Sequence, residues 1–126
     1  MPLVTITQVK GRTAEQKKKI GDAIQAALVE TGVPVADRFQ RFIDLEAGDF
    51  IFDNNYPDLS KPRTGAFTMI EILLSVGRSV KVKRKILGSL VAQLKTLGIE
   101  PNDLFVVFKE TSWENWAFAN GEILHA

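Results

Sequence analysis

The chain contains one pattern twice, and this internal repeat restricts the fold more than any other feature of the sequence. Gly11-Arg12-Thr13 follows an apolar segment and opens a helix-like stretch, and Gly77-Arg78-Ser79 does the same 66 residues later. The register continues, because the basic stretch 17–20 matches the stretch 83–86. A repeat of this length is typical of a fold built from two copies of one supersecondary unit.

Each copy predicts a strand, a helix and a second strand. In each copy, apolar and polar residues first alternate with a period of two, then apolar residues recur at helical spacing, and then the period of two returns. The first copy spans residues 2–53 and the second 67–118. Residues 54–66 hold two prolines and a glycine and predict the loop between the copies. In the first copy we expect a strand at 2–9, a helix that begins with a capping box at Thr13 and Gln16 and ends at Gly32, a strand at 39–45, and an extended piece at 50–52. In the second copy we expect a buried central strand at 67–76, a helix that begins at Ser79 and ends at Gly98, and a strand at 104–108. The tail from residue 110 is expected to form a short hairpin or arm.

These units predict an α+β fold in a single domain over residues 1–126. Two β-α-β units give a four-stranded sheet, and right-handed crossovers place both helices on one face. The other face then has no cover, although its strands are apolar. We therefore expect another copy of the chain to cover it.

Composition excludes several kinds of function. The chain has no cysteine and one histidine, His125, which we interpret as a tail residue. Disulfides, metal centres and Ser-His-Asp catalysis are thus not expected. A net charge of +1 gives no attraction for nucleic acid, so the lysine-rich first turns are interpreted as a solvated face. The sequence has no signal-peptide pattern and no apolar run of membrane length, which favours a cytoplasmic protein without a membrane partner.

The motifs in their order resemble the tautomerase superfamily over nearly the whole chain. The resemblance rests on the start Met1-Pro2-Leu3, the run from Gly11 to Lys17, and the segment from Glu114 to Gly121. Within that superfamily the chain resembles the two-unit branch, which includes malonate semialdehyde decarboxylase-like proteins and uncharacterised tautomerases. The resemblance implies a tautomerase/MIF-like homotrimer with a central barrel, a catalytic amino-terminal proline and no cofactor.

Pro2 is the principal candidate for chemistry. If Met1 is removed, Pro2 presents a free secondary amine, and an apolar pocket with nearby arginines would lower the pKa of that amine towards neutrality. Such an amine can act as a general base beside a carbonyl, or as a nucleophile that forms an iminium. The structural alternative is a proline that begins a strand, where its missing N–H does no harm. A retained Met1 would turn Pro2 into an amide without a basic lone pair.

Three arginines are candidates for binding an anionic substrate. Arg78 stands where a strand turns into a helix N-terminus, so its guanidinium and free backbone N–H groups can face one carboxylate. Arg12 is its counterpart in the first copy and is either binding or structural, while Arg38 could add a second positive charge. The resemblance implies a second arginine two positions after Arg78 in the decarboxylases, and this chain has Val80 there.

Asp37 lies in a segment similar to the one that carries a water-activating aspartate in the decarboxylases. Its alternative role is a structural turn, because Asp103 repeats it in the second copy. Trp116 and Phe118 are expected either to form an apolar wall around the amine or to cover the core or the trimer interface.

The sequence supports three hypotheses about function. The first is a homotrimeric, cofactor-free tautomerase in which Pro2 moves a proton on a small 2-oxo or enol acid held by Arg78. The second is decarboxylation or hydration of a 3-oxo or unsaturated acid by Pro2 with Asp37. The third is a trimeric protein without catalysis, favoured if Met1 is retained.

Overall fold

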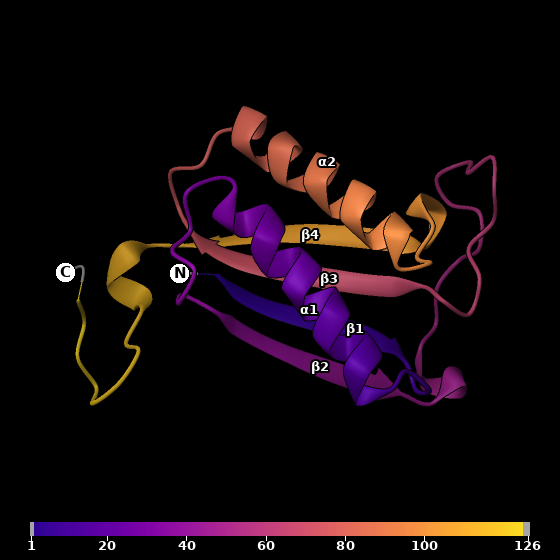
Figure 1. Ribbon diagram of the computed structural model, residues 1–126, viewed down its shortest axis with the longest axis horizontal. Helices are drawn as coiled ribbons and strands as arrows, with labels where there is room; N and C mark the ends of the chain where they lie inside the picture. The colour runs from indigo at the N-terminus through magenta and orange to yellow at the C-terminus, as the bar shows by residue number, and fades with distance from the viewer. Residues whose placement is uncertain (1, 125–126) are drawn as a thin grey trace.

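The computed structural model describes residues 2–124 and shows six main elements (Figure 1). The predictions for Met1 and His125 lie outside the described residues. In chain order the elements are β1 Leu3–Val9, α1 Ala14–Val29, β2 Phe39–Leu45, β3 Thr68–Ser75, α2 Val80–Thr96 and β4 Leu104–Thr111. Both β-α-β units are therefore present at the positions that the repeat predicted.

The strands form one four-stranded sheet in the order β2-β1-β3-β4. Within each unit the two strands are parallel, whereas β1 and β3, which join the units, are antiparallel. Both helices cover the same face, as expected from right-handed crossovers (Figure 1). Because the units run in opposite directions, equivalent residues of the two copies lie at opposite ends of the sheet.

The repeat extends to individual interactions. The backbone hydrogen bond from Lys10 N to Leu45 O is repeated 66 residues later by the one from Val76 N to Thr111 O. The ion pair Lys17–Asp44 is repeated in the same way by Lys83–Glu110. The capping box at Thr13 is confirmed, and Ser79 Oγ caps α2 in the same way by accepting from the Val82 amide. The two units therefore share local structure as well as sequence pattern.

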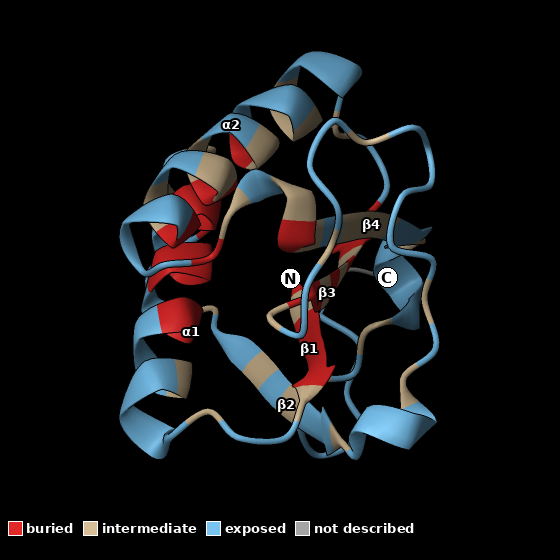
Figure 2. Cartoon of the chain, turned by 90° about the vertical axis from the view of Figure 1, so that its right-hand side faces the viewer, coloured by how far each residue is buried: buried red, intermediate tan, exposed pale blue. Residues whose placement is uncertain are grey.

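The core lies between the sheet and the helices. Figure 2 shows buried residues along the inner sides of α1 and α2 and on the central strands β1 and β3. On β3, Ile70, Ile72 and Leu74 are fully buried and face Ile24 of α1 and Leu90 of α2 within one apolar cluster. The predicted central, buried position of this strand is confirmed.

One local prediction needs correction. The last strand runs to Thr111, since it pairs with β3 along the whole length of β3. Residues 50–52 were expected to be extended, and Phe50 has an extended backbone; this piece pairs with no strand, and its aromatic rings pack on Phe67. Of the two forms expected for the tail, residues 112–124 show no hairpin and have a 3₁₀ turn at Trp113–Asn115.

The helix-free face of the sheet differs from the uniformly apolar face that we expected. Arg41 Nε donates to Thr5 Oγ1 at 2.9 Å, and Lys109 forms an ion pair with Glu71 on the neighbouring strand. Cross-strand pairing of this kind places charges on a sheet face without isolating them. A hollow of about 80 Å³ on this face is lined by Leu3, Thr5, Arg41, Glu71, Leu73 and Lys109.

Candidate active site

The sheet gathers most of the predicted site residues at one end. Leu3 pairs with Phe39 on one side and with Leu73 on the other. Pro2, directly before Leu3, is buried and therefore lies beside the start of β2 and the end of β3. Figure 1 shows the chain start, the turn into α2 and the C-terminal tail together at this end. We call this the Pro2 end.

Arg78 reaches the Pro2 end from the turn between β3 and α2. Gly77 opens the turn with a φ of +117°, a conformation that favours glycine, and Ser79 caps the helix that follows. Arg78 Nη1 donates to the Ser75 carbonyl at 3.1 Å, and this is its one hydrogen bond within residues 2–124. The other guanidinium N–H groups are therefore available to a carboxylate.

Three aromatic rings form a stack at the Pro2 end. The rings of Trp116 and Phe118 are nearly parallel at 9°, with centroids 5.9 Å apart, and Phe118 stacks on Phe39 at the same distance. Trp116 Nε1 is buried and has no hydrogen-bond partner among residues 2–124. The tail thus brings an apolar wall to the sheet. Sequence reasoning did not include Phe39 in the site, because its position opposite Leu3 comes from strand pairing.

Asp37 lies in the loop that leads into β2. Gln25 of α1 fixes this loop, because its Nε2 donates to the carbonyl oxygens of Pro34, Val35 and Asp37. Gln25 is itself buried, so the loop is attached to the core. The side chain of Asp37 is half-buried and precedes β2 at the Pro2 end. A carboxylate is therefore present near the proposed base.

Arg38 is engaged with α1. Its Nη2 donates to Asp22 Oδ1 at 2.8 Å and its Nε to Gln40 Oε1 at 3.2 Å. The hydrogen bonds from Arg38 and then Lys18 lower the pKa of the Asp22 carboxyl. Because Asp22 neutralises its charge, Arg38 is poorly placed as a second anchor for an anion within this chain.

Arg12 lies at the opposite end of the sheet from Pro2. Its Nη1 donates to Gln8 Oε1 at 2.6 Å and its Nη2 to the Ala66 carbonyl at 3.1 Å. Burial lowers the pKa of the Arg12 guanidinium, and the charges of Asp103 and Asp44 oppose this shift. Within one chain the structure therefore does not bring Arg12 together with Pro2.

The linker packs at this second end, which we call the Arg12 end. Asp103 is 3% exposed and accepts hydrogen bonds from the amide and the hydroxyl of Thr64, at 2.6 and 2.7 Å. Thr68, the counterpart of Pro2, donates to the Ala66 carbonyl. A cluster of rings completes the packing and consists of Phe50, Phe52, Phe67 and Phe105.

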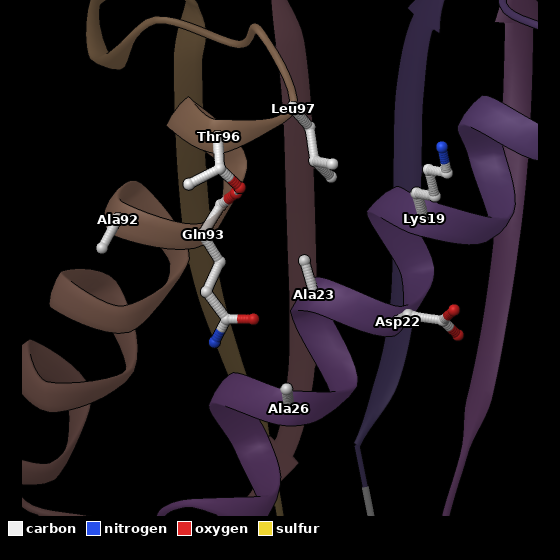
Figure 3. A pocket seen from close by; sticks show the side chains of 8 residues that line it. All are labelled: Lys19, Asp22, Ala23, Ala26, Ala92, Gln93, Thr96 and Leu97. Carbon is white, nitrogen blue, oxygen red and sulfur yellow. The ribbon is translucent and has the colours of Figure 1, made fainter.

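Other hollows lie away from the Pro2 end, and two of them, of about 300 and 350 Å³, are lined in part by Arg12. A hollow of about 650 Å³ lies between the outer sides of α1 and α2, and Figure 3 shows that Asp22 points away from it. Its lining residues are Lys19, Asp22, Ala23, Ala26, Ala92, Gln93, Thr96 and Leu97. Among residues 2–124 no three His, Cys, Asp or Glu side chains gather to hold a metal, and no helix is long and apolar enough to cross a membrane.

Two sequence families, both described as tautomerase enzymes, match the chain, one over residues 37–119 and the other over residues 2–58. A curated relative, the probable tautomerase YusQ of Bacillus subtilis (strain 168), is 28% identical over 123 residues. That alignment covers 96% of this chain and 95% of the relative. The similarity thus extends over both β-α-β units.

Solved structures agree with this sequence similarity. A malonate semialdehyde decarboxylase, FG41, inhibited by 3-bromopropiolate, superposes with a TM-score of 0.89 at 27% identity, covering 96% of this chain and 92% of that one. Another malonate semialdehyde decarboxylase gives a TM-score of 0.88 at 29% identity, with coverage of 96% and 93%. A fused 4-OT described as a symmetric trimer gives 0.76 at 23% identity over 96% and 94%, which supports the fold alone.

Proposed function

The chain belongs to the tautomerase family, and on this basis we propose that it is a cofactor-free tautomerase acting on a small 2-oxo or enol carboxylic acid. The observation that carries this proposal is the arrangement at the Pro2 end. A buried proline at the chain start, a turn arginine with free N–H groups and a stack of aromatic rings lie at one end of the sheet. For proton transfer beside a carbonyl, the proline would be the base, the arginine would bind the carboxylate, and the aromatic rings would exclude water.

In this proposal Pro2 is the base. Burial disfavours the charged form of its amine, so a neutral secondary amine is present near pH 7. Its lone pair takes a proton from the enol oxygen, and the resulting ammonium returns a proton to the carbon, which gives the keto form. No electrons leave the substrate and no cofactor enters the step.

Arg78 and the aromatic stack position the substrate. The carboxylate of the acid binds the guanidinium N–H groups that the Ser75 carbonyl leaves free. Trp116 and Phe118 exclude water on the other side, which strengthens the charged hydrogen bonds within the site. In contrast, Arg12 and Arg38 are proposed to be structural, because Gln8 and Asp22 already engage them.

Decarboxylation or hydration is the second candidate. It is favoured by the two malonate semialdehyde decarboxylase structures that superpose on the chain and by the half-buried Asp37 beside the start of β2. It is opposed by Val80, because the resemblance to the decarboxylases implies a second arginine at this position and this chain has an apolar side chain there. Tautomerisation needs only one carboxylate anchor and is therefore preferred.

We also propose that the protein is a homotrimer. The helix-free face combines apolar borders with paired charges, and a related fused 4-OT is described as a trimer. Size-exclusion chromatography with light scattering would test this, since a monomeric mass would contradict it. The expected cytoplasmic location stays a prediction.

The decisive experiment combines mass and kinetics. Intact-protein mass should show that native material lacks Met1, and a protein that retains it would favour the non-catalytic alternative. Phenylenolpyruvate ketonisation and malonate semialdehyde turnover are then compared for the wild type and Pro2→Ala. We expect ketonisation to be the faster reaction and to fall about 100-fold or more in Pro2→Ala, the usual size of a general-base contribution. Full activity in Pro2→Ala would rule out proline catalysis.

A further inference from the structure

Ser75 is the last residue of β3 and is fully buried, yet its hydroxyl has no hydrogen-bond partner among residues 2–124. Buried polar atoms in native proteins are nearly always paired, so an unpaired one needs an explanation. Leaving a hydroxyl without a partner costs about 1–3 kcal/mol. A hydroxyl left unpaired in this way suggests a hydrogen-bond partner that the contacts among residues 2–124 do not include.

The sheet places Ser75 next to the start of the chain. Strands β1 and β3 are antiparallel, and Leu3 pairs with Leu73. One step further along the same register, Pro2 comes beside Leu74, so Ser75 is next to the start of the chain. The carbonyl of Ser75 meanwhile accepts from Arg78 at 3.1 Å. Ser75 therefore stands between the proposed base and the proposed anchor.

The repeat shows that the turn itself does not require a hydroxyl at this position. The counterpart of Ser75 in the first unit is Val9. The backbone hydrogen bond just after it, from Lys10 to Leu45, is the same as the one from Val76 to Thr111. Both strands end and both turns form in the same way, with a valine at one end and a serine at the other. The serine occurs only at the end that holds Pro2.

We propose that Ser75 is a positioning residue for Pro2, and that its Oγ accepts a hydrogen bond from the N–H of the terminal amine. A neutral secondary amine has one N–H and one lone pair. Fixing the N–H against Ser75 directs the lone pair to the substrate carbon or oxygen. This inference rests on the proposed function only in that Pro2 must be a free amine.

The test uses a matched pair of variants, Ser75→Val and Ser75→Thr, in material whose mass confirms loss of Met1. The two side chains have nearly the same shape and differ in the hydroxyl. The hydrogen bond favours the charged form of the amine, so removing it lowers the pKa of Pro2. By ¹⁵N NMR titration we expect Ser75→Val to titrate roughly half a pH unit or more below the wild type, and Ser75→Thr to match the wild type.

Kinetics provide a second readout on the same variants. In Ser75→Val we expect kcat for the ketonisation to fall roughly 10-fold with little change in KM, because the base is misdirected while Arg78 still binds the carboxylate. Ser75→Thr should recover most of kcat. Val9→Ser, which places a hydroxyl at the equivalent point of the Arg12 end, should leave both the titration and kcat unchanged.

Three results would overturn the proposal. The first is equal Pro2 titration in Ser75→Val and Ser75→Thr. The second is a change confined to the oligomeric mass, which would mean that the hydroxyl pairs with another subunit. If both Ser75→Val and Ser75→Thr fail to fold, the Pro2 amine is titrated in Ser75→Ala, whose side chain is smaller. The third result is a Pro2 titration in Ser75→Ala that equals that of the wild type. Because the titration needs no substrate, a wild type inactive on every oxo acid would refute the proposed function without affecting this test.

Discussion

The two ends of the sheet have the same local structure, but their arginines differ in how many hydrogen bonds hold them within the chain. At the Arg12 end the guanidinium is held by Gln8 and by the Ala66 carbonyl. At the Pro2 end Arg78 makes a single hydrogen bond, to the Ser75 carbonyl. The difference comes from how the units are joined, because the linker enters the sheet at the first end and the chain begins at the second. The linker thus helps to hold one of two equivalent arginines.

A residue that differs between the two copies adds to this difference. Gln8 is buried, accepts from Arg12 and donates to Asp44. Its counterpart Leu74 is equally buried but has no polar atom to offer Arg78. The arginine of the first unit is therefore held by the side chain of Gln8, while Arg78 has only the hydrogen bond to the Ser75 carbonyl among residues 2–124.

The largest expected effect comes from removing each arginine in turn. Arg78→Ala should lower kcat/KM for phenylenolpyruvate by about 10- to 100-fold, the value of a hydrogen bond to a charged group, with little loss of stability. Arg12→Ala should leave kcat/KM within about twofold and lower the free energy of unfolding by about 1–3 kcal/mol, because Gln8 and the Ala66 carbonyl lose their donor. Steady-state kinetics and urea unfolding measure the two effects.

The comparison of the two ends fails if the two arginines behave alike. A loss of activity in Arg12→Ala without a loss of stability would mean that the Arg12 end also takes part in binding. Arg12→Lys serves as a control, because lysine keeps the positive charge but lacks the planar guanidinium that donates to both Gln8 and the Ala66 carbonyl.

A smaller effect is expected from adding a second cation beside Arg78. Val80→Arg places a guanidinium on the first turn of α2, where Val80 is 62% exposed and its replacement meets no packing barrier. We expect turnover of malonate semialdehyde to rise about 10-fold relative to phenylenolpyruvate, the effect of about 1.4 kcal/mol of added charge stabilisation. Ala14→Arg, the same change at the first residue of α1, should alter neither reaction.

The smallest effect concerns the ion pairs that the units share. Hydrogen bonds from Lys17 and then Gln8 lower the pKa of Asp44 in the folded state. A lowered pKa stabilises the fold above the unfolded value of about 3.9, and this contribution is lost as the pH falls further. Asp44→Asn should therefore cost about 0.5 kcal/mol at pH 7 and little below about pH 3.

Urea unfolding at the two pH values checks this. Glu110→Gln, which removes the equivalent pair with Lys83, is the matched variant and should cost less, because no glutamine side chain joins that pair. A larger cost for Glu110→Gln would mean that the pair at the Pro2 end is the more important one.

Much of the fold was predictable because the repeat carries local signals. The cap at Thr13, the turn at Gly77 and the apolar alternation of β3 act over a few residues, and each appears where the pattern predicts it. The site was predictable only in part. Pro2, Arg78 and the aromatic tail converge on one end, but Phe39 and Ser75 enter the site through strand pairing that no local pattern reveals.

The sequence by itself determined the elements, their order and the two equivalent Gly-Arg turns, since these follow from propensity, capping and apolar period. The tertiary structure decided which of the two arginines is held within the fold. Antiparallel pairing of β1 with β3 sends the turns to opposite ends, and the linker then occupies one of them through Thr64 and Ala66. Pairing and loop packing depend on contacts between residues far apart in the chain, so two turns that look alike in sequence hold their arginines differently in space.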